Sequence, residues 1–185
     1  KAGISRAPDD AHDVETLIAH ARMAAAEAQH SPDGVRRYSS DVQRAVARSH
    51  ERHYRLAEAL RADALDQVYQ PIVECGSGRI IGVEALARWT DGEHGQVSPD
   101  EFIPIAEADP ELRRLLTVCT LNSACRQLAE WREAHEVVPY VAVNIAGEEL
   151  YCEDFADMVA GLIAQHGVPA SHLVLEITEQ SVITD

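Results

Sequence analysis

Lysine is nearly absent from this sequence, and positive charge is scarce throughout. Lys1 is the only lysine, and 16 Lys and Arg residues stand against 31 Asp and Glu residues, so the net charge at pH 7 is −15. A protein that binds nucleic acid polymers neutralises phosphates with a basic surface, so this composition argues against that class. The negative net charge disfavours binding to anionic membranes for the same reason. An acidic protein can still bind an anionic ligand where metal ions or a few arginines make the local charge positive.

Long apolar runs, a signal peptide and closely spaced cysteine pairs are also missing. No stretch of about 18 apolar residues occurs, so we expect no membrane span and no direct membrane contact. The first residue is not methionine, which indicates a removed leader or a segment of a longer protein. The cysteines are scattered without a C-x-x-C pair, which predicts free thiols in a reducing cytoplasm: Cys75, Cys119, Cys125 and Cys152.

The content of 46% hydrophobic and 25% charged residues is that of a globular protein. A short strand is expected within residues 1–8, followed by a helix whose N-cap is Asp13. A long charged amphipathic helix over 41–65 then separates two differently patterned regions. The second region alternates strands with helices, which predicts an α/β domain with a largely parallel sheet. Its expected elements are a hairpin (68–73 and 79–89), a loop leading into a helix (99–109), helices over 112–134 and 149–166, and strands over 140–145 and 173–177.

Polar side chains interrupt three of these apolar strands. Glu84 lies in the second strand of the hairpin, Asn144 in the 140–145 strand and Glu176 in the 173–177 strand. A carboxylate in a buried sheet needs a compensating cation or a raised pKa. Two carboxylates and a carboxamide are hard oxygen ligands, which suit Mg²⁺ or Mn²⁺ better than zinc. From spacing alone, salt-bridged or capping residues are the favoured interpretation.

Two further features have a functional and a structural interpretation. His50 and His53 stand one helical turn apart and could bind zinc, but the H-E-x-x-H order is missing, which favours a solvated helix face. Trp89 could stack on a base, although packing at the strand end is the simpler interpretation. Cys119 and Cys125 are expected to pack as small hydrophobic residues.

Several short motifs together resemble the opening half of the EAL family, the cyclic-di-GMP phosphodiesterases named after Glu-Ala-Leu. The resemblance covers roughly residues 65–185, and the motifs occur in the family's order. They are Tyr69-Gln70-Pro71-Ile72-Val73, Glu84-Ala85-Leu86-Ala87-Arg88-Trp89, Ser98-Pro99-Asp100-Glu101-Phe102-Ile103-Pro104, Val143-Asn144 and Leu175-Glu176-Ile177-Thr178-Glu179.

The resemblance implies a modified (β/α)8 barrel with one antiparallel strand. It implies that two Mg²⁺ or Mn²⁺ ions support hydrolysis of cyclic-di-GMP to linear pGpG. By match to the family's motifs, Glu84, Asn144 and Glu176 are the metal ligands, with Glu84 catalytic. Arg88 matches the arginine that contacts a phosphate, and Gln70 and Leu86 match positions that line the dinucleotide site. Glu179 is a second-shell or surface residue.

The same resemblance leaves a second function open, because many EAL domains have lost catalysis. Such a domain acts as a cyclic-di-GMP receptor or a protein-interaction module, and the family also allows a homodimer through the EAL domain. The family's Asp-Asp pair, lysine and late glutamate have no match here, and a whole barrel takes roughly 250 residues. We therefore expect the 185-residue segment alone to be inactive. The family resemblance also implies a bacterial, cytoplasmic parent protein.

The N-terminal residues carry a weaker resemblance, to the end of a GGDEF (diguanylate cyclase-like) domain. It rests on Gly3-Ile4-Ser5, the helix over 17–29 and Arg36-Arg37-Tyr38. Ala25, Ala26 and Gln29 depart from the family pattern, where an aromatic residue and a lysine are usual. The expected organisation is a GGDEF-like remnant over 1–40, a connecting helix over 41–65 and half an EAL domain over 66–185.

Overall fold

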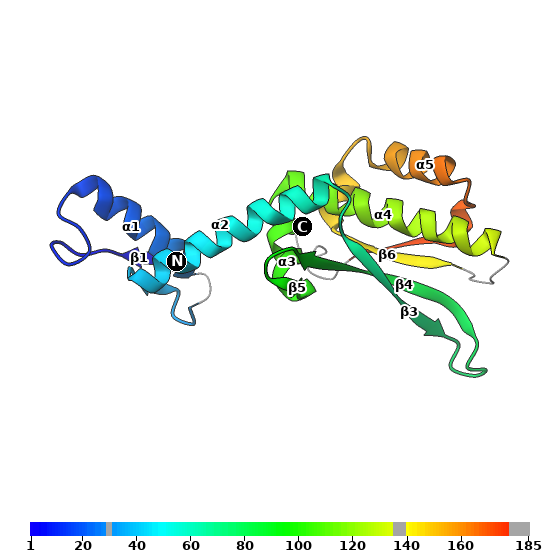
Figure 1. Ribbon diagram of the computed structural model, residues 1–185, viewed down its shortest axis with the longest axis horizontal. Helices are drawn as coiled ribbons and strands as arrows, with labels where there is room; N and C mark the ends of the chain where they lie inside the picture. The colour runs from blue at the N-terminus through cyan, green and yellow to red at the C-terminus, as the bar shows by residue number, and fades with distance from the viewer. Residues whose placement is uncertain (29–30, 135–139, 178–185) are drawn as a thin grey trace. The chain divides into compact units, whose positions relative to one another are not determined.

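The computed structural model describes residues 1–28, 31–134 and 140–177 (Figure 1). The chain divides into two compact units, Lys1–Arg55 and Leu56–Asp185. Helix α2 (Ser40–Arg61) crosses the boundary between them, so its last turns belong to the second unit. No helix of the described residues has both the length and the apolar character needed to span a bilayer.

The first unit is a small β-α-β arrangement. Strand β1 (Ala2–Ile4) pairs in parallel with β2 (Val35–Arg37), and α1 (Val14–Glu27) connects them. The predicted N-cap is confirmed, because Asp13 Oδ1 accepts a hydrogen bond of 2.8 Å from the Thr16 backbone N–H. That bond favours the ionised carboxylate and lowers the pKa of Asp13.

Gly3 allows α1 to pack directly on β1. A Cβ atom at this position would lie 1.9 Å from the Ala21 carbonyl oxygen and 2.3 Å from the Ala25 nitrogen. Both atoms belong to the helix backbone, so no side-chain rotation relieves the overlap. Position 3, the second residue of β1, must therefore lack a side chain for α1 and β1 to pack this closely.

We expect Gly3→Ala to destabilise the first unit by about 2–3 kcal/mol, because overpacking against backbone forces the helix away from the strand. Hydrogen exchange of the α1 amides measures this loss. Gly161→Ala in α5 is the matched control, since nothing lies within 4 Å of its added Cβ. Helix propensity predicts that the control stabilises α5 by about 1 kcal/mol. Unchanged α1 protection in Gly3→Ala would contradict the close packing.

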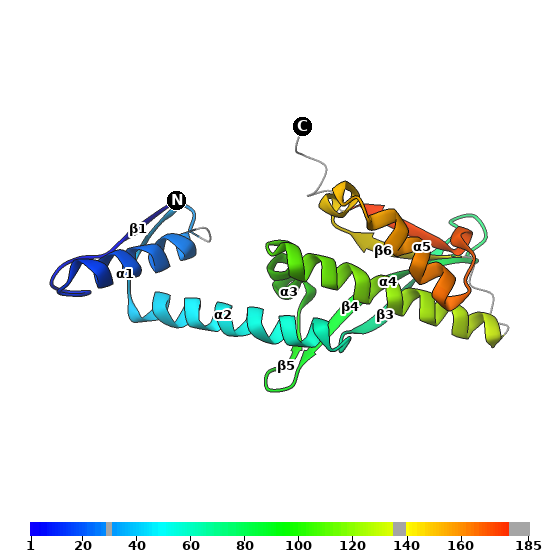
Figure 2. The same ribbon diagram turned by 90° about the horizontal axis from the view of Figure 1, so that it is seen from above.

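The second unit contains a mixed sheet with strand order β3-β4-β6-β7 (Figure 2). The predicted hairpin is confirmed: β3 (Asp66–Val73) runs antiparallel to β4 (Ile80–Asp91). Strands β6 (Val141–Ile145) and β7 (Leu173–Ile177) continue the sheet in parallel with β4. A short strand, β5 (Gly95–Val97), also pairs with the end of β4. One antiparallel strand beside parallel ones agrees with the expected start of an EAL-type barrel.

The helices differ from the sequence prediction at three places. Residues 99–109 are mostly helix rather than loop, because Pro99 occupies the first turn of α3 (Pro99–Glu107), where its missing N–H costs nothing. The helix predicted over 149–166 is divided into a 3₁₀ turn, η2 (Gly147–Tyr151), and α5 (Phe155–His166). Helix α2 ends at Arg61 instead of continuing to residue 65. As predicted, α4 (Pro110–Glu133) is long, and Gly167 at φ 62° ends α5.

Two apolar clusters hold the second unit together. In the first, alternate residues of β4 and β6 pack under α4 and α5, which lie on one side of the sheet (Figures 1 and 2). Its fully buried members include Leu121, Ala124, Cys125, Val141 and Val143. In the second, the end of α2 packs on α3, α4 and the end of β4 through Leu56, Leu60, Trp89, Phe102 and Leu112. Trp89 meets Phe102 edge to face at 6.0 Å, so it is a packing residue.

The cysteines are all free thiols, as expected, and they differ in exposure. Cys75 is exposed in the hairpin turn, whereas Cys119 and Cys125 are buried in α4. Burial raises the pKa of Cys119 to about 12 and also raises that of Cys125, because the apolar surroundings disfavour a thiolate.

We therefore expect thiol reagents at pH 8 to modify Cys75 rapidly and to leave Cys119 and Cys125 unmodified in the folded protein, since the thiolate is the reactive form. Mass spectrometry of peptides after timed alkylation measures the rates. The denatured protein is the control, and there these cysteines should react alike. Rapid modification of Cys119 in the folded state would show that its environment is open to solvent.

Candidate functional site

The sheet register brings polar residues from four strands onto one face. Gln70 of β3 lies directly opposite Glu84 of β4, and Asn144 of β6 lies beside Glu176 of β7. Glu84 pairs with Ala142, and because strand side chains alternate, Asn144 points to the same side as Ala142. These side chains therefore form a row across the sheet, on the face opposite α4 and α5.

Glu84 and Asn144 are in direct contact, although they are 60 residues apart in the sequence. The Asn144 Nδ2 group donates a hydrogen bond of 2.6 Å to Glu84 Oε1. Asn144 and Glu176 are exposed and Glu84 is half-buried. Helices α4 and α5 pack on the opposite face of the sheet.

Leu86 and Arg88 continue the same face of β4 beyond Glu84. Arg88 Nη1 donates to the carbonyl of Ala87 at 2.8 Å, which directs the guanidinium along the strand end. Among residues 1–28, 31–134 and 140–177, Arg88 forms no ion pair with a carboxylate. A guanidinium in this position can bind a phosphate through two parallel hydrogen bonds.

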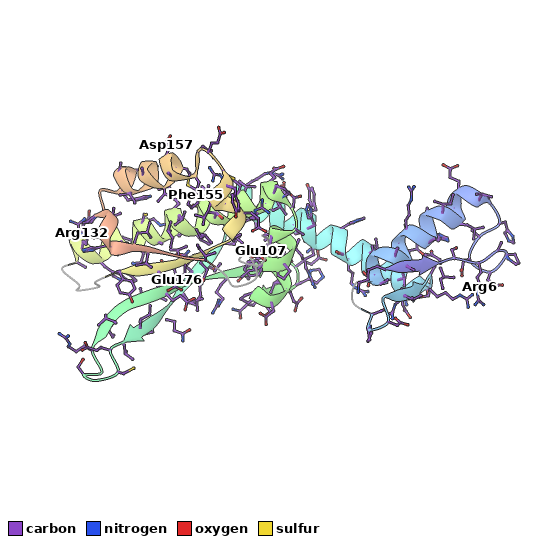
Figure 3. The ribbon with its side chains drawn as sticks, turned by 180° about the vertical axis from the view of Figure 1, so that it is seen from behind. Arg6, Glu107, Arg132, Phe155, Asp157 and Glu176 are labelled. Atoms are coloured by element: carbon purple, nitrogen blue, oxygen red, sulfur yellow. The ribbon has the colours of Figure 1, made fainter. Side chains whose placement is uncertain are left out.

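The polar face supplies some of the oxygen ligands that a hard cation such as Mg²⁺ requires. Glu84 and Glu176 supply carboxylate oxygens, and the Asn144 side chain supplies a carbonyl oxygen that its bond to Glu84 leaves unused. Figure 3 labels Glu176 on β7. Within the described part of the chain, no group of three or more His, Cys, Asp and Glu residues could hold a metal ion. Mg²⁺ commonly keeps several waters and few protein carboxylates, so two carboxylates and a carboxamide are compatible with it. Glu179 lies outside the described residues.

A cavity of about 300 Å³ opens where β4 and β6 separate. Their pairing ends at Ala85 and Val143, although both strands continue further. The residues that follow on each strand border the cavity, including Leu86, Arg88 and Asn144, and helices α3 and α4 close it. Of the three candidate ligands, Asn144 lines the cavity. The cavity lies toward the carboxyl ends of the parallel strands, where α/β folds commonly bind ligands.

Sequence analysis missed two charged residues of this cavity, Glu107 and Arg113. Burial raises the pKa of the Glu107 carboxyl, the nearby Glu148 raises it further, and Arg113 opposes both. Arg113 Nη1 donates to the Glu107 backbone carbonyl at 3.3 Å. The available signal was an acid at the end of an apolar helix, directly after Phe102-Ile103-Pro104-Ile105-Ala106.

A buried ion-pair network lies behind the cavity. Glu149 of η2 is 1% exposed, and its two carboxylate oxygens meet Arg113 Nε at 3.3 Å and Arg114 Nη1 at 3.1 Å. Arg114 Nη2 also meets Asp154 at 2.7 Å. These bonds join the start of α4 to the segment that follows Asn144 on β6. The network therefore fixes the position of Arg113 and of the β6 end.

Removal of the buried Glu149 carboxylate should lower the stability of the second unit. We expect Glu149→Ala to lower the free energy of unfolding of the second unit by about 3–5 kcal/mol, because it leaves two guanidinium groups without their buried partner. Urea unfolding followed by circular dichroism measures the change. Asp154→Ala is the control: its side chain is 75% exposed, so its loss should cost about 1 kcal/mol or less. Equal effects of the two variants would contradict this network.

Comparison with known proteins agrees with this geometry. The EAL domain family is matched over residues 53–185, which is most of the chain. The chain belongs to the EAL domain family. Rv1354c, a protein of Mycobacterium tuberculosis, is 33% identical over 99% of the chain, which spans 30% of that relative. MucR of Pseudomonas aeruginosa, described as a bifunctional diguanylate cyclase and cyclic-di-GMP phosphodiesterase, is 34% identical over 70% of the chain and 19% of its own length.

Solved EAL structures have the same fold. The MucR phosphodiesterase in complex with cyclic-di-GMP aligns with a TM-score of 0.66 and 33% identity, over 73% of this chain and 54% of that one. The FimX EAL domain of Xanthomonas citri, also in complex with cyclic-di-GMP, aligns with a TM-score of 0.65 and 25% identity, over 76% and 53% of the two chains. The chain thus spans less than two thirds of each relative. The similarity supports the first part of a TIM-like barrel.

Proposed function

We propose that the complete protein carrying this EAL segment hydrolyses cyclic-di-GMP to linear pGpG with the help of Mg²⁺ or Mn²⁺. The observation that carries the proposal is the row of Gln70, Glu84, Asn144 and Glu176 across four neighbouring strands. The similarity to the MucR phosphodiesterase bound to cyclic-di-GMP supports the choice of substrate.

Each residue of the row has a proposed role. Glu84, Asn144 and Glu176 would help to hold two Mg²⁺ or Mn²⁺ ions, which when bound act as Lewis acids and lower the pKa of a bound water. Arg88 binds a phosphate of the dinucleotide and keeps the scissile bond over the row. Gln70 and Leu86 line the dinucleotide site on either side of Glu84. For Glu179 we keep the proposal of a second-shell residue.

The second candidate is a receptor that binds cyclic-di-GMP without hydrolysing it. The observation in its favour is the fold similarity to the FimX EAL domain of Xanthomonas citri, whose structure holds cyclic-di-GMP. A homodimer through the EAL domain would serve either function.

For the rest of the chain we keep the proposed division into a GGDEF-like remnant over 1–40, a connecting helix over 41–65 and the first half of an EAL domain over 66–185. The β-α-β arrangement of the first unit supports a folded domain end rather than a linker. The description of MucR, which combines diguanylate cyclase and phosphodiesterase, gives a precedent for the two activities in one protein.

We expect Glu84→Ala in the complete protein to reduce metal-dependent hydrolysis of cyclic-di-GMP by at least about a thousandfold, because the loss of a metal ligand removes several kcal/mol of transition-state stabilisation. Chromatography of pGpG formed with Mg²⁺ or Mn²⁺ measures the rate. Glu74→Ala is the control, since Glu74 lies in the hairpin turn and its side chain bonds only Ser77 and Arg79 among the described residues.

The outcomes separate the two candidates. Undiminished metal-dependent hydrolysis in Glu84→Ala would refute the assignment of Glu84. Tight binding of cyclic-di-GMP by the wild-type protein, with no pGpG formed with either metal, would establish the receptor instead.

A further inference from the structure

The ring of Tyr140 lies over Gly82, on the same face of the sheet as Glu84. A Cβ atom at position 82 would lie 2.5 Å from Tyr140 Cζ, 2.5 Å from Cε2 and 2.8 Å from Cε1. These carbons form the hydroxyl end of the ring, so the ring reaches from the start of β6 across the neighbouring strand β4. A side chain of any size at position 82 would therefore displace the ring.

Backbone pairing between β4 and β6 fixes this contact. The Val83 N–H donates a hydrogen bond of 3.0 Å to the Tyr140 carbonyl oxygen, and Val83 pairs with Val141. Because side chains alternate along a strand, the Cβ direction of Gly82 is that of Glu84 two residues later. The Tyr140 ring therefore lies next to Glu84 on the polar face, on the side toward the amino ends of the parallel strands.

Gly82, Tyr140 and Ala142 form a packed floor beside the polar row. Gly82 is buried and Tyr140 is half-buried. Ala142, which pairs with Glu84, is 0% exposed. Since the Ala142 side chain points to the polar face, neighbouring side chains of that face must cover it. Glu84 stands at the edge of this floor, where its Oε1 accepts the 2.6 Å hydrogen bond from Asn144.

The floor restricts the conformations that Glu84 can adopt. A free glutamate side chain has several rotamers, and only some of them bring its carboxylate to a neighbouring metal ligand. The Tyr140 ring occupies the space toward the amino end of β4, so the carboxylate is directed toward Asn144. A ligand that is held in its binding conformation before the ion arrives loses less conformational entropy on binding.

We propose that Tyr140 is a positioning residue for Glu84, and that position 82 must be glycine because the ring is seated there. This inference rests on the proposed function, since it concerns the residue assigned to the metal ions. Tyr140 acts only through Glu84. Its ring provides the effect by filling space, and its hydroxyl group is not required.

Binding of Mn²⁺ alone tests the assignment. The complete protein is titrated with Mn²⁺, and the free ion is measured by electron paramagnetic resonance. Glu84→Ala is the reference, because the binding that it loses separates this site from the other carboxylates of a chain with net charge −15. We expect Tyr140→Ala to weaken this binding about three- to tenfold, since Glu84 must then be immobilised by the ion itself. Tyr140→Phe keeps the ring and should match wild type.

Gly82→Ala tests the same contact from the other strand. Its added Cβ displaces the ring, so this variant should also weaken Mn²⁺ binding. Combining it with Tyr140→Ala should cause no further loss, because the two changes act through one contact. Gly161→Ala, with nothing within 4 Å of its Cβ, and Tyr54→Ala, with Tyr54 65% exposed on α2, are the controls and should match wild type.

Thermal unfolding of each variant separates positioning from stability. A purely structural role for Tyr140 would lower the melting temperature and leave the Mn²⁺ affinity of the folded protein unchanged. Unchanged affinity in Tyr140→Ala, with binding still lost in Glu84→Ala, therefore overturns the inference and leaves the proposed function intact. Equal weakening in Tyr140→Phe and Tyr140→Ala also overturns it, because the hydroxyl would then be the acting group.

Two further results are decisive. Losses that multiply in the double variant would show that Gly82 and Tyr140 act separately, which contradicts the proposed contact. A wild-type protein that binds no more Mn²⁺ than Glu84→Ala and forms no pGpG refutes the proposed function, and the inference with it.

Discussion

The parallel pairing of β4 with β6 is the interaction on which the rest of the site depends. This pairing sets Glu84 beside Ala142 and brings Asn144 Nδ2 to 2.6 Å from Glu84 Oε1. The two residues are 60 positions apart in the sequence, so no local pattern in either strand specifies their contact. Because side chains alternate, a register shift of one residue would move Glu84 to the face that α4 and α5 cover. The apolar residues on that face, such as Val83 and Val141, therefore hold the polar row in place while contributing nothing to its chemistry.

The pairing of β4 with β6 covers only three residue pairs, and a cavity lies where it ends. Beyond Ala85 and Val143 the strands separate, and the space between them becomes a cavity that α3 and α4 close. The buried Glu149 and its two arginines keep the α4 side of that cavity in position. A desolvated ion pair is a weak source of stability but a strong constraint on geometry, because every misplaced partner leaves an unpaired buried charge.

Local features of the chain could be predicted because they depend on near neighbours. The Asp13 cap, the hairpin around residues 76–78 and the helix end at Gly167 follow from bonding and backbone preferences within a few residues. Two of the departures have tertiary causes. A loop was expected over 99–109, yet Phe102 and Ala106 bury one face of α3 and stabilise it. Segment 149–166 reads as one helix, but the buried contacts of Glu149 fix η2 as a separate turn.

The sequence by itself determined the family, the order of the elements and the identity of the polar strand residues, because motifs and periodicity are written in consecutive positions. Only the tertiary structure decided that Glu84 and Asn144 touch and that Glu107 and Arg113 meet at a cavity. These facts join residues on different elements, and the distance between such residues is set by strand register and helix packing, which no local pattern of amino acids specifies.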